Sequence, residues 1–394
     1  MKFIAFLEIL PDKISTYIQG WRERLPDDDK VKVIIPPHIM PEPYKGVDGY
    51  IVFEADSTAA MIAYLSKFEK SGAKVRLSYS WEEPDLVKEY SEFLTHKKQA
   101  EEEWAATKIE RIRGLGTTSR LEILPLVDWH KSREDLSVET GVSYLIKTDE
   151  NCILFDLGLN SMNADPSPLL QNMEKLGIHL EDVDSIVISH PHGDHVGGGK
   201  WLRDKTFSLT GRQIPLTGKE VYTPMPMTYP RLTPIHSKNP TKIGKGVTTT
   251  GTIARAIFSM GLTPEQALAV NVEGKGIVLV IGCGHQTLPR ILKSFEDMFE
   301  EPLYGIVGGL HYPVEGGPVE YFGTAPHRFG GTGKPPWEQI TKEELQASID
   351  SLKQKSPKLV ALSPHDSSPM SLEAFRKVFG AAHRELRVGD PIII

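Results

Sequence analysis

The sequence predicts an α/β protein of two domains, in which a small α+β domain precedes a larger domain of alternating strands and helices. Three observations lead to this prediction. Apolar periodicity over residues 2–80 follows the order β-α-β-β-α-β, a charged segment comes next, and a second series of strands begins near residue 121. A chain of 394 residues is long enough for two domains of ordinary size.

The order of elements in the first domain is that of the ferredoxin-like split pattern, in which two helices pack on one face of a four-stranded sheet. The apolar face of the first helix is expected to consist of Ile14, Tyr17, Ile18, Trp21 and Leu25. Ser57 is expected to cap the second helix, which ends at Gly72, and His38 lies in a Pro-rich segment expected to turn. The expected strands are residues 2–10, 31–35, 50–54 and 75–80. This domain resembles small α+β domains that pair sheet to sheet, so we expect a homodimer.

A charged connector separates the two domains. Residues 84–113 are rich in Glu, Lys, Gln and Ala with sparse apolar positions, which predicts a long exposed helix. Glycine and hydroxyl residues at 114–119 then break the pattern. We therefore expect domains at residues 1–83 and 117–394, joined by a helical connector at 84–116.

The composition excludes several classes of partner. The net charge of −7 provides no basic field for nucleic acid. No apolar segment approaches the length of a membrane span, and Glu8 interrupts the apolar run at the N-terminus, so no signal peptide is expected. Cys152 and Cys283 lie far apart in apolar runs and indicate no disulfide framework, which suits a reducing compartment. We expect a cytoplasmic protein that binds neither nucleic acid nor a membrane.

The second domain begins with strands at 121–127, 142–147 and 152–156, which an amphipathic helix at 169–176 and a strand at 186–189 follow. Asp156 ends the third strand, just before a glycine. A carboxylate there would either orient a metal-binding imidazole or form a simple turn. This alternation of strand and helix predicts an α/β layer arrangement with its site at the strand ends.

A cluster of four side chains able to bind a metal follows the strand at 186–189. The cluster consists of His190, His192, Asp194 and His195. Residues two apart in an extended or turning backbone point to the same side, so His190 and His192 can share one ion. Asp194 and His195 can reach a second ion. The strand before the cluster and the glycines after it favour a metal site over a solvated His-rich loop.

The motif His-Pro-His-Gly-Asp-His at 190–195, followed by Val-Gly-Gly and preceded by Ile-Leu-Phe-Asp-Leu-Gly at 153–158, resembles the metallo-β-lactamase superfamily over roughly residues 120–394. The resemblance implies a four-layer αββα fold, in which two sheets face each other between outer helices. It also implies one or two metal ions at the edge where the sheets meet. The implied ligands are His190, His192, Asp194 and His195, with Asp156 as a supporting residue.

Two positions depart from the usual pattern of that superfamily. Leu262 stands where a further histidine is usual, and Cys283 stands where a bridging aspartate is usual, so His285 is expected to replace the missing ligand. The elements Gly-Cys-Gly-His at 282–285, Gly-Gly-Leu-His at 308–311 and Ser-Pro-His-Asp at 363–366 resemble one subgroup. It is named for an archaeal dihydropterin-ribofuranosyl-aminobenzene-phosphate synthase. The resemblance makes His365 the last metal ligand, while Cys283 is either a ligand or a packed thiol beside the site.

Glycine-flanked loops directly after apolar strands place His285 and His311 for a functional site rather than for the core, and His365 follows a strand in the same way. His130 also follows a strand and would either line the pocket or have a structural role. Two long insertions, at 206–251 and 318–337, are expected to be lids or binding loops. Arg231, Arg328 and Lys334 in these insertions are either anchors for an anionic substrate or ordinary solvated charges. His327 is either a substrate contact or a plain loop residue.

Together these residues predict a metal-dependent hydrolase that uses a metal-bound hydroxide on a small anionic substrate, such as a phosphoester, lactone or thioester. His190, His192 and His285 would surround one divalent ion. Asp194, His195 and His365 would surround the other. Zinc is favoured, with manganese and iron open.

The expected catalytic residues are Asp194 and His311, of which His311 would donate a proton or hold developing negative charge. Two alternatives remain. One is a pterin-related transferase or synthase that acts on a diphosphate substrate. The other is a di-iron redox or sensing protein.

Overall fold

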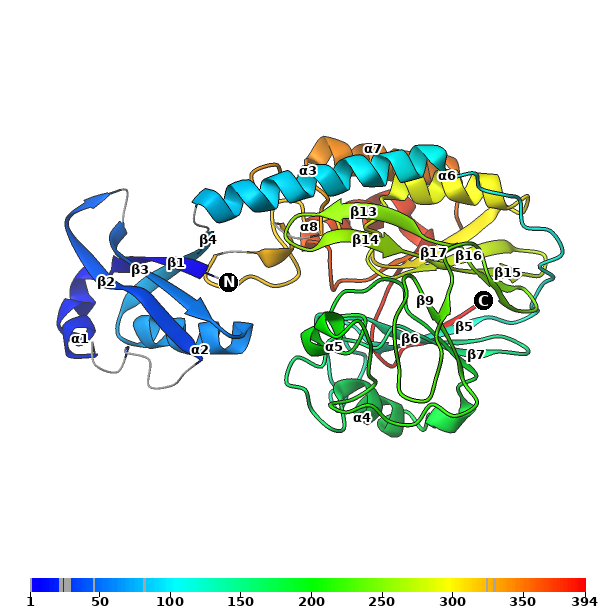
Figure 1. Ribbon diagram of the computed structural model, residues 1–394, viewed down its shortest axis with the longest axis horizontal. Coiled ribbons are helices and arrows are strands. Elements are labelled where there is room, and N and C mark those ends of the chain that lie inside the picture. Colours follow the sequence, from blue (N-terminus) through cyan, green and yellow to red (C-terminus); the bar gives the residue numbers. More distant parts are fainter. Residues whose placement is uncertain are drawn as a thin grey trace. The chain divides into compact units, whose positions relative to one another are not determined.

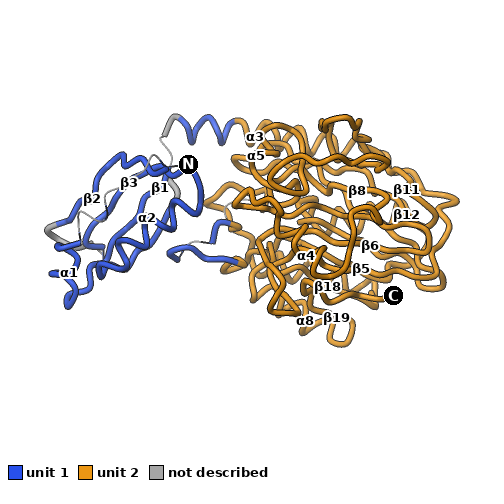
Figure 2. The backbone as a smooth tube through the Cα atoms, turned by 90° about the horizontal axis from the view of Figure 1, so that it is seen from below, with its two compact units in different colours: residues 1–91, 319–326 blue, residues 92–318, 327–394 orange. Residues whose placement is uncertain are grey.

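The computed structural model describes residues 2–20, 24, 30–44, 47–80, 83–323, 325–328 and 331–394. The chain forms two compact units (Figure 2). Unit 1 comprises Met1–Ser91 and Val319–Pro326, and unit 2 comprises Glu92–Pro318 and His327–Ile394. Among the described residues, no helix combines the length and the apolarity needed to cross a membrane.

Unit 1 is built on a four-stranded sheet in the order β2-β3-β1-β4, with antiparallel neighbours. Its elements are β1 (Lys2–Ile9), α1 (Ile14–Gln19), β2 (Val31–Tyr44), β3 (Val47–Ala55), α2 (Thr58–Lys70) and β4 (Ala73–Ser80). The hydroxyl of Ser57 accepts a hydrogen bond from the backbone N–H of Ala60 at 3.1 Å, so the predicted cap of α2 is confirmed. The core of the unit lies between the sheet and α2, where Phe53, Leu65 and Phe68 are fully buried.

The first helix differs from the predicted one. Only Tyr17 of α1 is buried, whereas Ile14 and Ile18 are 49% and 62% exposed. The helix has six residues, so a single side chain of it reaches the core. Trp21 and Leu25 lie outside the described residues.

The Pro-rich segment around His38 is strand rather than turn. β2 continues to Tyr44, and His38 pairs with Tyr50 of β3. β2 is an edge strand, where the missing N–H groups of proline cost no ladder hydrogen bond, and its register shifts on both sides of His38. The expectation of a turn was therefore wrong because the sequence does not show which strand lies at the edge.

Helix α3 (Glu83–Ala106) begins in unit 1 and ends in unit 2, in the region of the predicted connector.

Unit 2 contains two seven-stranded sheets. The first has the order β10 (Ile235–His236), β9 (Glu220–Thr223), β8 (Ser185–Val187), β7 (Cys152–Phe155), β6 (Ser143–Lys147), β5 (Glu122–Val127) and β20 (Ile392–Ile393). The second has the order β11 (Lys242–Gly244), β12 (Val247–Thr249), β15 (Leu268–Val272), β16 (Gly276–Ile281), β17 (Leu303–Gly308), β18 (Leu359–Leu362) and β19 (His383–Glu385).

The two sheets face each other and helices cover their outer faces. Tyr144 and Phe155 of the first sheet share a buried apolar cluster with Val280 and Val307 of the second. The outer face of the second sheet packs on α6 (Leu288–Met298), α7 (Lys342–Gln354) and α8 (Pro369–Phe379). The outer face of the first packs on α4 (Pro168–Lys175) and α5 (Gly199–Arg203), so the layers of unit 2 are helix, sheet, sheet, helix (Figure 1).

The first insertion is not a lid. Residues 206–251 contain β9, β10, β11 and β12, which extend the two sheets, and Met227 and Tyr229 are buried in the core beside the first sheet. A separate hairpin of β13 (Ile253–Ile257) and β14 (Gly261–Glu265) follows it. In the second insertion, the backbone carbonyl of Phe322 accepts a hydrogen bond from the N–H of Leu77 at 3.0 Å, within unit 1.

Candidate metal centre

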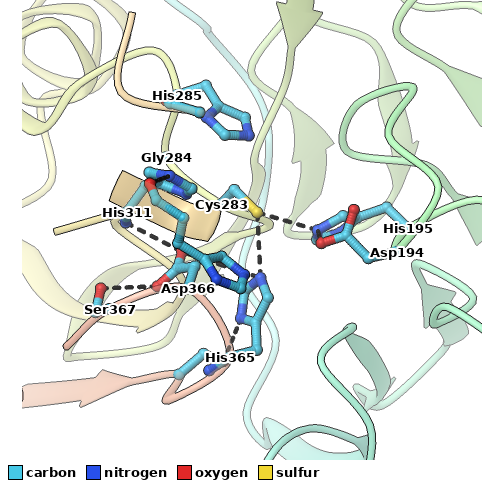
Figure 3. Close-up of polar contacts among 12 residues, drawn as sticks. Asp194, His195, Cys283, Gly284, His285, His311, His365, Asp366 and Ser367 are labelled. Atoms are coloured by element: carbon cyan, nitrogen blue, oxygen red, sulfur yellow. Dashed lines mark hydrogen bonds and ion pairs between the residues drawn. The ribbon is translucent and has the colours of Figure 1, made fainter. Parts of the chain in front are cut away.

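The candidate centre lies at the carboxyl ends of parallel strands in the two sheets of unit 2. β7 and β8 run parallel and lead to Asp156 and to the loop at 190–195. β16, β17 and β18 also run parallel and lead to the elements at 282–285, 308–311 and 363–366. Because parallel strands end at the same edge of a sheet, side chains far apart in the sequence become neighbours here (Figure 3).

Three imidazole rings form the first part of the centre. The ring centroids of His190, His192 and His285 lie 4.6 to 4.8 Å from one another, and all three side chains are buried. Nε2 of His190 and Nε2 of His285 have no hydrogen-bond partner among the described residues. Two buried nitrogen atoms of this kind are costly unless a ligand satisfies them.

Cys283 lies in the middle of the second part. Its Sγ atom is 3.1 Å from Nε2 of His195 and 3.1 Å from Nε2 of His365 (Figure 3). The donor atoms of Asp194, His195, Cys283 and His365 lie within 4.8 Å of one another. A donor atom of Cys283 also lies within 4.8 Å of those of His190 and His285, so this thiol is common to both parts.

Hydrogen bonds to Nδ1 fix the orientation of four of the imidazoles. Ser189 Oγ lies 2.9 Å from Nδ1 of His190, and Gly331 O lies 2.8 Å from Nδ1 of His285. Ligating histidines commonly have this kind of support, because a partner at one ring nitrogen directs the other toward the metal.

The second part of the centre is supported in the same way. Asp156 Oδ2 lies 2.7 Å from Nδ1 of His195, and Ser363 Oγ lies 2.6 Å from Nδ1 of His365. His192 is different, because its Nε2 lies 3.2 Å from Thr263 Oγ1. In the other four rings Nδ1 has a partner, so Nε2 points into the centre; these rings are His190, His195, His285 and His365. In His192, Nδ1 is the nitrogen left to bind a ligand.

Burial sets the charge of most of these imidazoles. It lowers the pKa of His190, His285 and His365 well below the usual value, and it lowers the pKa of His192 to about 4. These four rings are therefore neutral at neutral pH, which is the state that binds a metal ion.

His195 is the exception. Burial opposes its charge, but the pKa of His195 is raised well above the usual value because Cys283, Asp194 and Asp156 surround it. Burial likewise disfavours the charged form of Asp194, yet the positive charge of His195 and its hydrogen bond hold the pKa of Asp194 below the usual range.

Three buried carboxyl groups belong to the centre although the sequence did not single them out. Asp128 accepts hydrogen bonds from Ser363 and Tyr144. Glu265 accepts the backbone N–H groups of Cys283 and Gly284 at 3.0 and 2.8 Å. Burial raises the pKa of Asp128 and that of Glu265 to about 7.

The third carboxyl group, Asp366, accepts the backbone N–H of His311 at 3.0 Å. It holds His311 at a φ of +52°, and the ring centroid of His311 lies 4.8 Å from that of His285. Asp366 stands in the motif at 363–366, directly after His365, whereas Asp128 lies two residues before His130 and Glu265 three residues after Leu262. No spacing within these segments shows what the carboxyl groups contact.

The anion-contacting residues predicted in the insertions fall in different places. The backbone carbonyl of His327 lies 3.3 Å from Nε2 of His311, and the two ring centroids are 6.1 Å apart, so His327 lies beside the centre. Arg328 follows it, with a buried Nε that has no partner among the described residues. Arg231 is exposed, between Tyr229 and Leu232, and does not line the pocket described below.

His130 is also away from the centre. Its Nδ1 lies 3.0 Å from a carboxylate oxygen of Glu385, and both side chains are close to half exposed. The structural alternative for His130 therefore describes it, and the pocket-lining alternative was wrong.

The donor set fits a divalent metal ion. Imidazole, carboxylate and thiol groups are metal ligands, and the two unpartnered nitrogens identify an inward face that no protein group satisfies. A buried set of such donors, at the strand ends of a domain with helices outside two facing sheets, defines a metal-dependent enzyme.

Residues 136–325 match the family described as the Metallo-beta-lactamase superfamily, so the chain contains a domain of this superfamily. The predicted αββα fold and the predicted metallohydrolase class are thereby confirmed. The chain is also similar to the 7,8-dihydropterin-6-methyl-4-(beta-D-ribofuranosyl)-aminobenzene-5'-phosphate synthase of Methanocaldococcus jannaschii. The two are 23% identical, over 51% of this chain and 80% of that protein.

Two solved structures are similar as well. Tm1679, described as a metal-dependent hydrolase of the beta-lactamase superfamily, is 18% identical and has a TM-score of 0.47, over 69% of this chain and 98% of that one. YhfI from Bacillus subtilis, a metallo-beta-lactamase fold protein, is 14% identical and has a TM-score of 0.44, over 70% of this chain and 100% of that one.

Proposed function

We propose that the protein hydrolyses a small anionic substrate with the help of two divalent metal ions. The observation that carries this proposal is the position of Cys283. Its Sγ lies within 4.8 Å of donor atoms of His190 and His285, and also within 4.8 Å of donor atoms of Asp194, His195 and His365. The substrates that suit such a centre are phosphoesters, lactones and thioesters, whose carbonyl or phosphoryl oxygen a metal ion can polarise.

In this proposal, His190, His192 and His285 hold one ion. Asp194, His195 and His365 hold the other, and Cys283 is a ligand common to both rather than a packed thiol. Imidazole and thiolate ligands favour zinc, whereas manganese prefers oxygen ligands. Zinc is therefore the proposed metal.

When bound, divalent ions would supply Lewis acidity, which makes a bound water more acidic and the substrate more electrophilic. The chain itself supplies orientation and proton transfer. Asp156 and Ser363 hold the rings of His195 and His365 by their Nδ1 atoms. His311 lies beside His285 at the open side of the centre, where it would donate a proton or hold developing negative charge. Asp194 would position the nucleophile.

Metal content tests the proposal. We would measure it by elemental analysis on full-length protein purified without a His tag, for the wild type, His192→Ala and the matched control His179→Ala, whose side chain is exposed. About two zinc ions per chain in the wild type and in His179→Ala, with loss in His192→Ala, are expected. Phosphoesters, lactones and thioesters would then be assayed as substrates. Full activity of His192→Ala would contradict the metal assignment.

A second candidate function is a pterin-related transferase or synthase that acts on a diphosphate substrate. The similarity to the synthase of Methanocaldococcus jannaschii favours it. This function predicts product only when a phosphorylated substrate and a pterin-like co-substrate are both present. A di-iron redox protein, the remaining alternative, predicts iron in the elemental analysis and absorption of visible light.

We further propose that residues 1–83 form a ferredoxin-like domain, joined by a connector at 84–116 to the catalytic domain at 117–394. The antiparallel sheet with the order β2-β3-β1-β4 supports the first part.

We also propose a homodimer formed through the sheet face that carries Ile4, Phe6, Tyr50 and Val52, which are only partly buried. The molar mass in solution tests this, and a monomeric mass would contradict it. Two free cysteines fit a cytoplasmic location.

A further inference from the structure

A cavity of about 310 Å³ adjoins the candidate metal centre within unit 2. His285 and His311 line the part next to the centre, and Arg255 and Lys334 line it as well. The volume is at the lower end of the range of small-molecule sites. Glu344 also lines the cavity and forms an ion pair with Lys334, so Arg255 is the cation that the cavity presents beside the proposed catalytic residues.

Arg255 has a partly buried guanidinium group that forms few contacts with protein acceptors. It comes from β13, and its Nη2 donates one hydrogen bond, to the backbone carbonyl of Thr332 at 3.2 Å. It forms no ion pair with any carboxylate in the described part of the chain, although burial is strong enough to lower its pKa. A cation in such a place is costly unless an anion joins it.

The carboxylates that act electrostatically on Arg255 already form ion pairs with other cations. Glu101 and Glu344 are the acidic residues that act on Arg255. Glu101 forms an ion pair with Arg290, and Glu344 forms one with Lys334 at 2.6 Å. Arg255 thus keeps a positive charge that no ion pair in the described part of the chain neutralises.

The loop at 331–334 is shaped to pass over this arginine. Gly333 has a φ of +66°, and a Cβ atom there would lie 1.9 Å from Nε of Arg255. Any other residue at 333 would therefore push the guanidinium out of place. Gly333 therefore lets the backbone pass close to the guanidinium group of Arg255, which still lines the cavity.

The amino end of helix α6 adds a second positive field. Thr287 and Pro289 line the cavity, and Thr287 is the N-cap residue of this 11-residue helix. Its hydroxyl makes no capping hydrogen bond, so it is available to a ligand. Backbone N–H groups and the helix dipole favour an oxyanion at such an end.

We propose that this cavity binds a phosphate group of the substrate, which makes the substrate of the proposed hydrolase a phosphate ester. This inference rests on the proposed function for the identity of the reaction, but not for the binding of the anion. The planar guanidinium of Arg255 would hold two phosphate oxygens, and the hydroxyl of Thr287 and the end of α6 would hold others. A carboxylate has too few oxygens to use all of these donors.

Inorganic phosphate is the probe, titrated calorimetrically into the full-length protein as purified and again after chelation of metal. The variants are Arg255→Met, Arg255→Lys and the matched control Arg231→Met, whose arginine is exposed. We expect phosphate to bind wild type and control alike in both preparations. Arg255→Met should weaken binding about tenfold or more, and Arg255→Lys should weaken it less, since lysine lacks the bidentate fork.

The chelated protein separates this inference from the proposed hydrolysis, because phosphate cannot bind to metal there. Binding that disappears on chelation, that is equal in Arg255→Met and wild type, or that is absent would overturn the inference whatever the activity assays show. Acetate is the second probe, and acetate binding as tight as that of phosphate would overturn the choice of phosphate. If circular dichroism shows that Arg255→Met does not fold, the comparison of Arg255→Lys with wild type decides in its place.

Discussion

Cys283 Sγ lies 3.1 Å from Nε2 of His365, although 82 positions separate the two residues in the sequence. β16 and β18 bring them together, because both strands run parallel to β17 and end at the same edge. This thiol faces two imidazoles, and in the proposed centre it stands where the superfamily resemblance implies a bridging aspartate. A softer donor at this point should change both the metal preference and the metal affinity of the centre.

Replacing Cys283 by alanine should lower the zinc content and weaken zinc binding, since one donor disappears from both groups. Cys283→Asp should restore binding and shift preference from zinc toward manganese, because a carboxylate is a harder ligand. Elemental analysis and competition with a zinc chelator measure both effects. Cys152→Ala is the matched control, because that cysteine is free and lies in β7 away from the donor groups. Unchanged zinc content in Cys283→Ala would mean that Cys283 is a packed thiol and not a metal ligand.

Asp156 should act on the centre through His195 rather than by direct metal contact. Asp156→Asn keeps the size of the side chain but loses the charge that faces Nδ1 of His195. We expect metal affinity to fall about 10- to 100-fold, as for other supporting carboxylates. Chelator competition gives the affinity, and the exposed Asp182→Asn is the control. An affinity equal to wild type would leave Asp156 as a turn residue only.

The local parts of this structure could be predicted from the sequence. The elements of unit 1 appear in the predicted order, and the strand before the loop at 190–195 and the cap at Ser57 follow from periodicity and hydroxyl placement. These features depend on neighbours in the chain, which a sequence shows directly. The Pro-rich part of β2 was wrongly predicted as a turn. A strand can contain these prolines because β2 lies at the edge of the sheet, and that position depends on the fold.

The parts that depend on tertiary contact could not be predicted. Arg255 lies in an unremarkable strand, and only its approach to Thr332 and His285 around one cavity gives it a possible function. Asp128 and Glu265 lie in segments where a histidine or a missing histidine is more conspicuous. Arg231 was chosen for its loop composition, whereas the loop contributes strands to the two sheets and is not the lid that its composition predicted.

Removal of metal should destabilise the protein. The candidate histidine ligands are buried, so the free protein keeps the neutral imidazoles of His190, His285 and His365 packed without a metal partner. A ligand at a thousand times its dissociation constant stabilises a protein by about 4 kcal/mol, which is a change of several degrees in melting temperature. Thermal unfolding with chelator and after return of zinc measures this change. His192→Ala should show a smaller response to chelator, and an unchanged melting temperature in the wild type would contradict metal binding.

Gly331 should be needed for activity because its backbone lies against two histidines. Its carbonyl accepts a hydrogen bond from Nδ1 of His285, and a Cβ atom at this position would lie 2.2 Å from the ring of His311. Gly331→Ala should therefore displace His311 and lower kcat at least about tenfold, as loss of a positioned proton donor does. Gly331 has a φ of +88°, so backbone strain must be separated from this clash.

Gly218→Ala provides that separation, because Gly218 has a φ of +78° and no atom within 4 Å of the added Cβ. Both variants should lose stability in thermal unfolding, since both force alanine into the left-handed region, and Gly331→Ala should lose more because of its clash with His311. Only Gly331→Ala should lose turnover of the substrate found in the assays. Equal loss of kcat in the two variants would mean that strain alone explains the effect, and His311 would then lose its proposed part in catalysis.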